Sequence, residues 1–274
     1  MSTEAILRPS LLLGTPQPNW EDSILQNQIG WWVTPDGGTG KVRNLVKPTT
    51  SALLQSGAGW TYGKYTPMMS FDGGANAYVD LGATALLAST DPFTLMWTER
   101  ATNTGAYRGL FVFSPSGTAQ KFIVLRDDTD VNYRYLTASI CNVGACVRFA
   151  TVPTLAAGVA VDRTYFLIGR GGMGSTTLSQ FDVWGQETIV TPYPASAGNP
   201  LGSFTGGQNY IGWDSVDNKW NGAIGNVRLW TRVLFLNEIK RLFVDGMAGV
   251  MRPRALFPSS AAPATRRDRM FAAM

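Results

Sequence analysis

Apolar and polar residues alternate with a period of two in many short segments of this chain, a spacing typical of β-strands. The clearest segment is residues 93–98, in which every second residue is large and apolar. Two further runs, residues 110–113 and 122–125, are apolar without alternation, which predicts central strands buried on both faces. Turns rich in glycine, asparagine and aspartate separate these segments at intervals of roughly a dozen residues. The pattern predicts an all-β fold, a two-sheet antiparallel sandwich.

The last predicted strand lies within residues 222–243. Val227 and Leu229 share one face of this strand, with Arg228 on the other. Ile224 is out of phase with Val227 by one position, because residues of one face recur at every second position. We therefore expect a β-bulge near Gly225 that restores the phase.

The spacing of apolar residues changes after residue 232 to that of a helix. Residues three to four positions apart are apolar, namely Leu236, Ile239, Leu242 and Phe243. Lys240 and Arg241 take the opposite side, so an amphipathic helix of about two turns is predicted. Asn237 is the expected cap of its first turn and Gly246 its closing residue.

Two adjacent tryptophans, Trp31 and Trp32, lie in the first predicted strand. Neighbouring side chains of a strand point to opposite faces. We therefore expect one tryptophan in the core, and the other either covered by the preceding residues or exposed.

The chain divides into three predicted parts. Residues 1–28 hold scattered prolines without a clear period and predict an extended N-terminal arm, residues 29–246 form the sandwich, and residues 247–274 form a C-terminal tail rich in proline, alanine and arginine. Most of the tail's charge comes from Arg252, Arg254, Arg266, Arg267 and Arg269. The tail is either a solvated segment or a docking segment for an acidic protein surface. Nucleic acid is not the expected partner, since aromatic residues do not alternate with these arginines.

Composition removes several classes of chemistry. The chain has no histidine, which excludes histidine-dependent nucleophilic catalysis and histidine-ligated zinc. A glycosidase needs two carboxylates about 5–9 Å apart, and the few glutamates stand far apart in this sequence. We therefore expect a protein that is not an enzyme and has no cofactor.

Two acidic loops are candidates for calcium, an ion that prefers oxygen ligands. One holds Asp127, Asp128 and Asp130, and the other holds Asp214 and Asp217. The alternative is that these aspartates accept hydrogen bonds from backbone amides in turns, which is the more common role.

Aromatic residues near predicted loops are candidates for stacking on sugar rings. They are Trp184, Tyr210, Trp213 and Trp220. The alternative is packing in the core, since tryptophan is mostly buried in folded proteins.

Cys141 and Cys146 flank the turn of a predicted hairpin and could face each other across it. The predicted connection is four residues long, residues 142–145. A disulfide is possible there, but synthesis in a cytoplasm favours free thiols.

Four segments resemble, in order, those of the laminin G-like, concanavalin A-like jelly-roll family. Residues 70–82 resemble a strand pair of the family, residues 91–100 its strand with the pattern FT…W, and residues 208–225 its penultimate strand and loop. The terminal motif of the family is matched by Gly222, Ile224, Val227, Arg228, Leu229, Trp230, Arg232, Leu234, Glu238 and Ile239. The resemblance covers about residues 30–243 and implies a jelly-roll sandwich.

Two departures from the family pattern bear on function. Gly225 and Asn226 replace an acidic pair, and Phe235 replaces the usual serine or threonine before the helix. A calcium site that depends on that acidic pair is therefore not expected.

The family includes lectin-like glycan-binding modules, glycosidases and phage virion proteins. No basic leader precedes the first apolar run, residues 5–13, and no segment is long enough to span a membrane, so we expect synthesis in a host cytoplasm. A single such domain with an arm and a basic tail resembles the phage virion proteins.

We therefore predict a non-enzymatic virion structural protein, a capsid decoration or stabilising protein. Its expected partners are the major capsid protein or other virion subunits, bound through the arm and the tail, with several copies of the chain in the assembly. The alternative is a glycan-binding adhesin or fibre module on a virion or cell surface.

Overall fold

The computed structural model describes residues 22–33, 40–47, 51–63, 67–74, 76–88, 90–101, 107–113, 121–127, 133–142, 145–156, 163–170, 176–181, 187–190, 209–213 and 219–245. Most of the predicted arm and the whole predicted tail lie outside these residues. None of the helices in the described part is long and apolar enough to cross a membrane.

The described residues form sixteen strands and very little helix. The strands are β1 (Gln28–Val33), β2 (Lys41–Asn44), β3 (Ser51–Leu54), β4 (Ala58–Tyr62), β5 (Pro67–Asp72), β6 (Val79–Gly82), β7 (Phe93–Ala101), β8 (Tyr107–Phe113), β9 (Lys121–Asp127), β10 (Tyr133–Asn142), β11 (Ala145–Ala156), β12 (Arg163–Gly169), β13 (Thr176–Phe181), β14 (Glu187–Val190), β15 (Asn209–Ile211) and β16 (Asn221–Trp230). A short 3-10 helix, η1 (Ser23–Leu25), precedes β1, and the helix α3 (Leu236–Asp245) follows β16.

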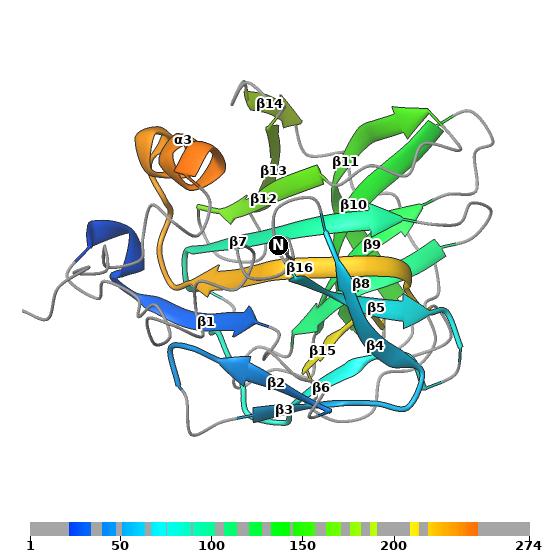
Figure 1. The fold of residues 1–274 in the computed structure, drawn as a ribbon. Coiled ribbons are helices and arrows are strands. Elements are labelled where there is room, and N and C mark those ends of the chain that lie inside the picture. The colour runs from blue at the N-terminus through cyan, green and yellow to red at the C-terminus, as the bar shows by residue number, and fades with distance from the viewer. Residues whose placement is uncertain are drawn as a thin grey trace, which may run out of the picture.

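The strands pair antiparallel along one path that folds back on itself to make two layers (Figure 1). The path runs β11-β10-β9-β8-β15-β6-β3-β2-β1-β16-β7-β12-β13-β14, and β5 joins β4 to β16. Phe111 on β8 and Ile211 on β15 share one buried cluster with Trp97 on β7 and Leu229 on β16. The core therefore lies between a β8-β15-β6-β3 layer and a β1-β16-β7-β12 layer. The predicted antiparallel β-sandwich with one short helix is confirmed.

A second core lies on the other side of the β1-β16-β7-β12 layer, under α3 and η1 (Figure 1). It consists of Ile24, Leu25, Trp31, Met96, Phe166, Ile168, Trp230, Leu234, Ile239 and Leu242. Trp32 belongs to the core between the layers, whereas Trp31 belongs to this second core. Both tryptophans are therefore buried, and η1 is among the elements that cover Trp31.

The predicted bulge in β16 is present. The register with β7 shifts by one residue between Gly225 and Arg228, and Asn226 lies there with a left-handed φ of 49°. Asparagine tolerates this conformation better than most residues with a side chain. The extra residue brings three side chains to the same core, and they are Ile224, Val227 and Leu229.

The bulge also marks a change of partner on the other edge of β16. Residues 221–225 pair with β5, and residues 227–230 pair with β1. Strand β16 therefore has hydrogen-bonded neighbours on both edges and a hydrophobic cluster on each face.

Two local predictions were wrong by one or two residues. The β10–β11 hairpin pairs Asn142 with Ala145, so its connection has two residues and not four. Helix α3 begins at Leu236, so Phe235 holds the capping position and Asn237 lies inside the first turn. Leu236 is among the exposed large apolar residues and does not face the second core.

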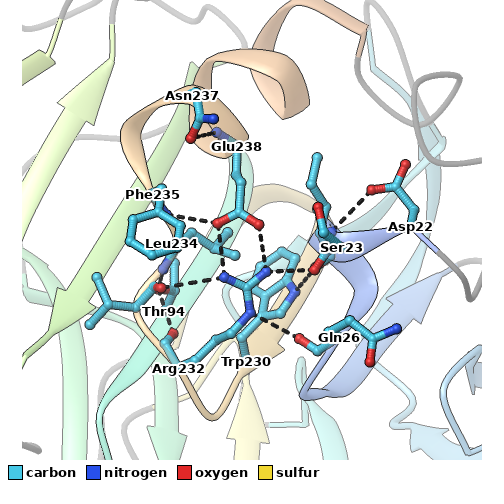
Figure 2. A network of polar contacts seen from close by, with 12 residues as sticks. Asp22, Ser23, Gln26, Thr94, Trp230, Arg232, Leu234, Phe235, Asn237 and Glu238 are labelled. Carbon is cyan, nitrogen blue, oxygen red and sulfur yellow. Dashed lines mark hydrogen bonds and ion pairs between the residues drawn. The ribbon is translucent and has the colours of Figure 1, made fainter.

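Arg232 ties α3 to the segment that contains η1 (Figure 2). Its Nη2 atom donates to Glu238 Oε1 at 2.7 Å and to the backbone oxygen of Ser23 at 2.8 Å, and its Nε donates to the backbone oxygen of Gln26 at 3.0 Å. Trp230 Nε1 donates to the backbone oxygen of Ile24 at 2.6 Å. We call these contacts the Arg232 clasp.

Glu238 completes the clasp and replaces the missing side-chain cap of α3. Its Oε2 accepts from the backbone N–H of Phe235 at 2.8 Å, as a glutamate in a capping box does. Burial alone would raise the pKa of Glu238, but the hydrogen bonds from Arg232 and Phe235 and the charge of Arg232 outweigh burial and lower it. The clasp therefore needs an ionised Glu238.

The bulge predicts that two substitutions of Asn226 differ in their effect on the free energy of unfolding. Both Asn226→Val and Asn226→Gly remove the hydrogen bond that Asn226 Oδ1 accepts from Arg228. Only valine is strained at a positive φ, at a cost of about 1–2 kcal/mol. Urea unfolding should show Asn226→Val to be less stable than Asn226→Gly by about that amount. Equal stabilities would contradict the left-handed bulge.

The clasp predicts a pH-dependent loss of stability in Glu238→Gln. At pH 7 the variant should lose about 2 kcal/mol, because a charged hydrogen-bonded pair becomes a neutral one. A lowered folded-state pKa stabilises the fold above the usual value of 4.5 and loses that effect as the pH falls through the folded-state pKa. The difference between wild type and variant should therefore shrink in urea unfolding below pH 4.5. A difference that stays constant down to pH 3 would contradict the role of the charge.

Candidate functional site

The outer face of the β8-β15-β6-β3 layer carries a row of residues that are direct cross-strand partners. Leu53 on β3 lies opposite Asp80 on β6, Asp80 lies opposite Tyr210 on β15, and Tyr210 lies opposite Val112 on β8. Their neighbours Val79 and Ile211 face the core between the layers. Alternation along a strand therefore turns Asp80 and Tyr210 outward.

Three aromatic side chains meet on this face, and we call them the aromatic patch: Tyr78, Tyr210 and Trp213. The Tyr78 and Tyr210 ring centroids are 5.3 Å apart with the rings nearly perpendicular. The Trp213 centroid lies 4.7 Å from that of Tyr78 and 4.6 Å from that of Tyr210. These are the distances at which aromatic rings attract each other.

Lys219 places a positive charge against the patch. A β-bridge pairs Lys219 with Trp213, and its Nζ lies 3.0 Å from the Trp213 ring centroid and 4.8 Å from that of Tyr78. An ammonium over an aromatic face is a cation–π contact. Arg108 Nη1 donates to the backbone oxygen of Lys219 at 3.3 Å and helps to fix this position.

A glycine turn directs Trp213 back onto the patch. Gly212 has a φ of +84°, and a Cβ atom there would lie 2.6 Å from the ring of Phe71. Its backbone N–H donates to the oxygen of Leu110, and its own oxygen accepts from the N–H of Trp220. The residue after Tyr210 and Ile211 must therefore be glycine for the chain to turn here.

The three residues of the patch and Lys219 differ in exposure. Tyr210 is 5% exposed and Lys219 is 7% exposed, whereas Tyr78 and Trp213 are half-buried. Tyr210 and Lys219 therefore form the base of the patch. Tyr78 and Trp213 are the rings that present surface to solvent.

The environment of Tyr210 keeps its phenol protonated. Burial first, then the charge of Asp80 and the neighbouring Tyr78, raise the pKa of Tyr210 to about 12. The hydroxyl therefore remains a hydrogen-bond donor through the physiological pH range.

Of the four aromatic residues predicted from the sequence to stack on sugars, Tyr210 and Trp213 lie together in the patch. Trp220 is fully buried in the core between the layers, which is the alternative that the sequence left open. Trp184 lies outside the described residues. Tyr78 and Lys219 were missed, although Tyr78 lies two residues before Asp80 and therefore on the same, polar side of a predicted strand.

The other predicted sites fall mostly outside the described part of the chain. This holds for Asp128, Asp130, Asp214, Asp217, Arg252, Arg254, Arg266, Arg267 and Arg269, and for the side chain of Asp127. The described residues hold no group of three cysteine, aspartate or glutamate side chains that could bind a metal ion. The backbones of Cys141 and Cys146 are direct partners in the hairpin, and their side chains are not among those described.

Comparison with known proteins finds similarity in structure alone. No protein-family model and no curated protein matches the chain. The binding domain of Paraclostridial Mosquitocidal Protein 1 matches with a TM-score of 0.53 and 10% identity, over 81% of this chain and 52% of that one. The binding domain of Botulinum Neurotoxin DC, solved in complex with SialylT, matches with a TM-score of 0.50, 10% identity and the same coverage.

A mutant of Trypanosoma rangeli sialidase that displays trans-sialidase activity matches with a TM-score of 0.52 and 12% identity, over 90% of this chain and 39% of the enzyme. This chain therefore spans about half or less of the length of these structures. At such low identity, the likeness shows a shared β-sandwich fold.

The raised pKa of Tyr210 predicts that the stabilities of wild type and Tyr210→Phe depend differently on pH at alkaline pH. A raised folded-state pKa stabilises the fold fully below the usual value of 10.0 and loses that effect as the pH rises toward 12. Wild type should therefore lose stability relative to Tyr210→Phe between pH 10 and 12. Urea unfolding midpoints at pH 9, 10, 11 and 12 measure this, and parallel pH profiles of the two proteins would contradict it.

Proposed function

We propose that this protein is a glycan-binding module and that the aromatic patch is its sugar site. The observation that carries the proposal is the meeting of Tyr78, Tyr210 and Trp213 on one outer face, with Lys219 and Asp80 beside them. The apolar face of a sugar ring packs against an aromatic side chain, and its hydroxyls need polar partners at the edge. The patch offers both kinds of group.

The residues of the patch and the neighbouring Asp80 have distinct parts in this proposal. Tyr78 and Trp213 are the half-buried rings against which a sugar would pack. Asp80 accepts hydrogen bonds, and the protonated Tyr210 hydroxyl donates them. The tight contacts among the rings hold the site before the ligand arrives, which limits the entropy lost on binding.

Binding fits this arrangement better than catalysis. Glycoside hydrolysis needs two carboxylates about 5–9.5 Å apart in most families. The patch and its cross-strand row contain one acid, Asp80. The toxin binding domains among the similar structures support the same choice, because both are binding domains and one of them was solved in complex with SialylT.

The role of a capsid decoration protein stays a prediction, and none of the comparisons supports it. It depends on the arm and the tail, which lie outside the described residues. The two roles are compatible in one molecule, since α3 and η1 lie on the outer face opposite the aromatic patch. A domain held at the α3 side would leave the patch open.

The proposal predicts that Trp213→Ala and Tyr78→Ala weaken glycan binding. The full chain should first be screened on a glycan array, and the best ligand should then be titrated by calorimetry. Loss of a ring at the centre of a binding site lowers affinity about tenfold or more. Tyr62→Ala is the matched control, because Tyr62 is 85% exposed and lies on β4, which pairs with β5 and not with β6 or β15. It should leave the affinity unchanged.

Two results would overturn the proposal. One is an array without any bound glycan. The other is an affinity that both patch variants leave at the wild-type value, with circular dichroism showing all three proteins folded.

A further inference from the structure

The second core contains a buried cation whose hydrogen-bonding capacity is only partly used. Arg228 is 0% exposed and lies on the face of β16 that is covered by α3 and η1. Its guanidinium carbon sits 3.8 Å from the ring centroid of Trp31, its direct partner on β1. Its Nε donates to Asn226 Oδ1 at 2.9 Å. Among the described residues, neither terminal nitrogen, Nη1 or Nη2, has a hydrogen-bond partner.

In the described part of the chain, the surroundings of Arg228 hold a second unpaired donor and no free acidic side chain that could accept from it. Trp31 Nε1, on the ring beneath the guanidinium, is a buried donor that no described residue accepts from. Glu238 of the Arg232 clasp is already paired with Arg232, and Asp22, the residue before η1, is paired with Arg241. Neither acid therefore supplies a countercharge to Arg228.

A buried charge without a partner is costly, because desolvation removes several kcal/mol of hydration from each ion. Burial lowers the pKa of Arg228 to about 9, so the group still carries its charge at neutral pH. Nη1 and Nη2 form the edge of a guanidinium that binds a carboxylate through two parallel hydrogen bonds. Trp31 and Asn226 already orient the group, and neither Nη1 nor Nη2 donates a hydrogen bond to any described residue.

We propose that Arg228 and Trp31 form a buried binding site for a single carboxylate, received by Nη1 and Nη2 of Arg228 under the cover of α3 and η1. This site lies on the side of the sandwich opposite the aromatic patch and does not depend on glycan binding. The carboxylate has two sources to distinguish. It is either a small carboxylate from solution or a carboxylate of residues 1–21, which precede η1 and contain Glu4 and Glu21.

The test measures thermal unfolding of the full chain at pH 7 in sodium acetate and in sodium chloride of equal ionic strength. A ligand that binds only the folded state raises its stability. If the carboxylate comes from solution, the Tm of wild type should be about 2–4 °C higher in acetate. Arg228→Met should lose that shift.

The second part of the test uses the double substitution Glu4→Gln/Glu21→Gln. If residues 1–21 supply the carboxylate, these substitutions should lower the Tm of the wild-type protein in both salts. They should leave the Tm of Arg228→Met unchanged. Arg241→Met is the matched control. Its ion pair with Asp22 is partly exposed, so it should keep the wild-type response to acetate and to the arm substitutions.

The outcomes separate cleanly. Two measurable effects are at stake: the rise of the Tm in acetate, and the fall of the Tm caused by Glu4→Gln/Glu21→Gln. The proposal is overturned if the wild-type protein shows neither effect. It is also overturned if Arg228→Met shows the same effects as the wild-type protein. An Arg228→Met protein more stable than wild type in both salts would also overturn it, because removal of an unpaired charge stabilises a fold and removal of a paired one does not.

Discussion

The structure depends on strand β16, and β16 depends on one extra residue. Its two edges are hydrogen-bonded to β7 on one side and to β5 and then β1 on the other, so no edge is left to absorb an error in register. Both of its faces are buried. A register slip of one residue would exchange the core between the layers for the core under α3 along the whole strand. The bulge at Asn226 is what lets Ile224 and Val227 enter the same core.

This constraint also explains the composition of the face beneath α3. After the bulge, Arg228 and Trp230 turn away from the core between the layers, toward η1 and α3. Trp230 fits there because its Nε1 reaches the backbone of Ile24. Arg228 is in the same layer with its charge stacked on Trp31. The second core is therefore partly polar, and the Arg232 clasp that covers it is polar as well. Specific geometry and not apolar area alone fixes η1 and α3 in place.

The sequence predicts the parts of this fold that depend on short-range periodicity. The alternation around Leu95, the break in phase before Val227 and the helical spacing after Arg232 are all local signals, and each led to the correct element. The exact helix start was wrong, because Glu238 satisfies the N–H of Phe235 from inside the helix and no capping side chain is needed. The burial of both Trp31 and Trp32 also required the second core, which no periodicity reveals.

The candidate site was only half predictable, because its members come from strands that are distant in sequence. Tyr210 and Trp213 stand close together and were both found, whereas Tyr78 joins them only because β6 and β15 pair in the folded sandwich. Lys219 reaches Trp213 through a single β-bridge after a glycine turn. The same pairing that assembles the patch places it on the layer opposite α3 and η1. A ligand on the patch and a partner on the α3 side would therefore contact opposite faces of the sandwich, and neither would obstruct the other.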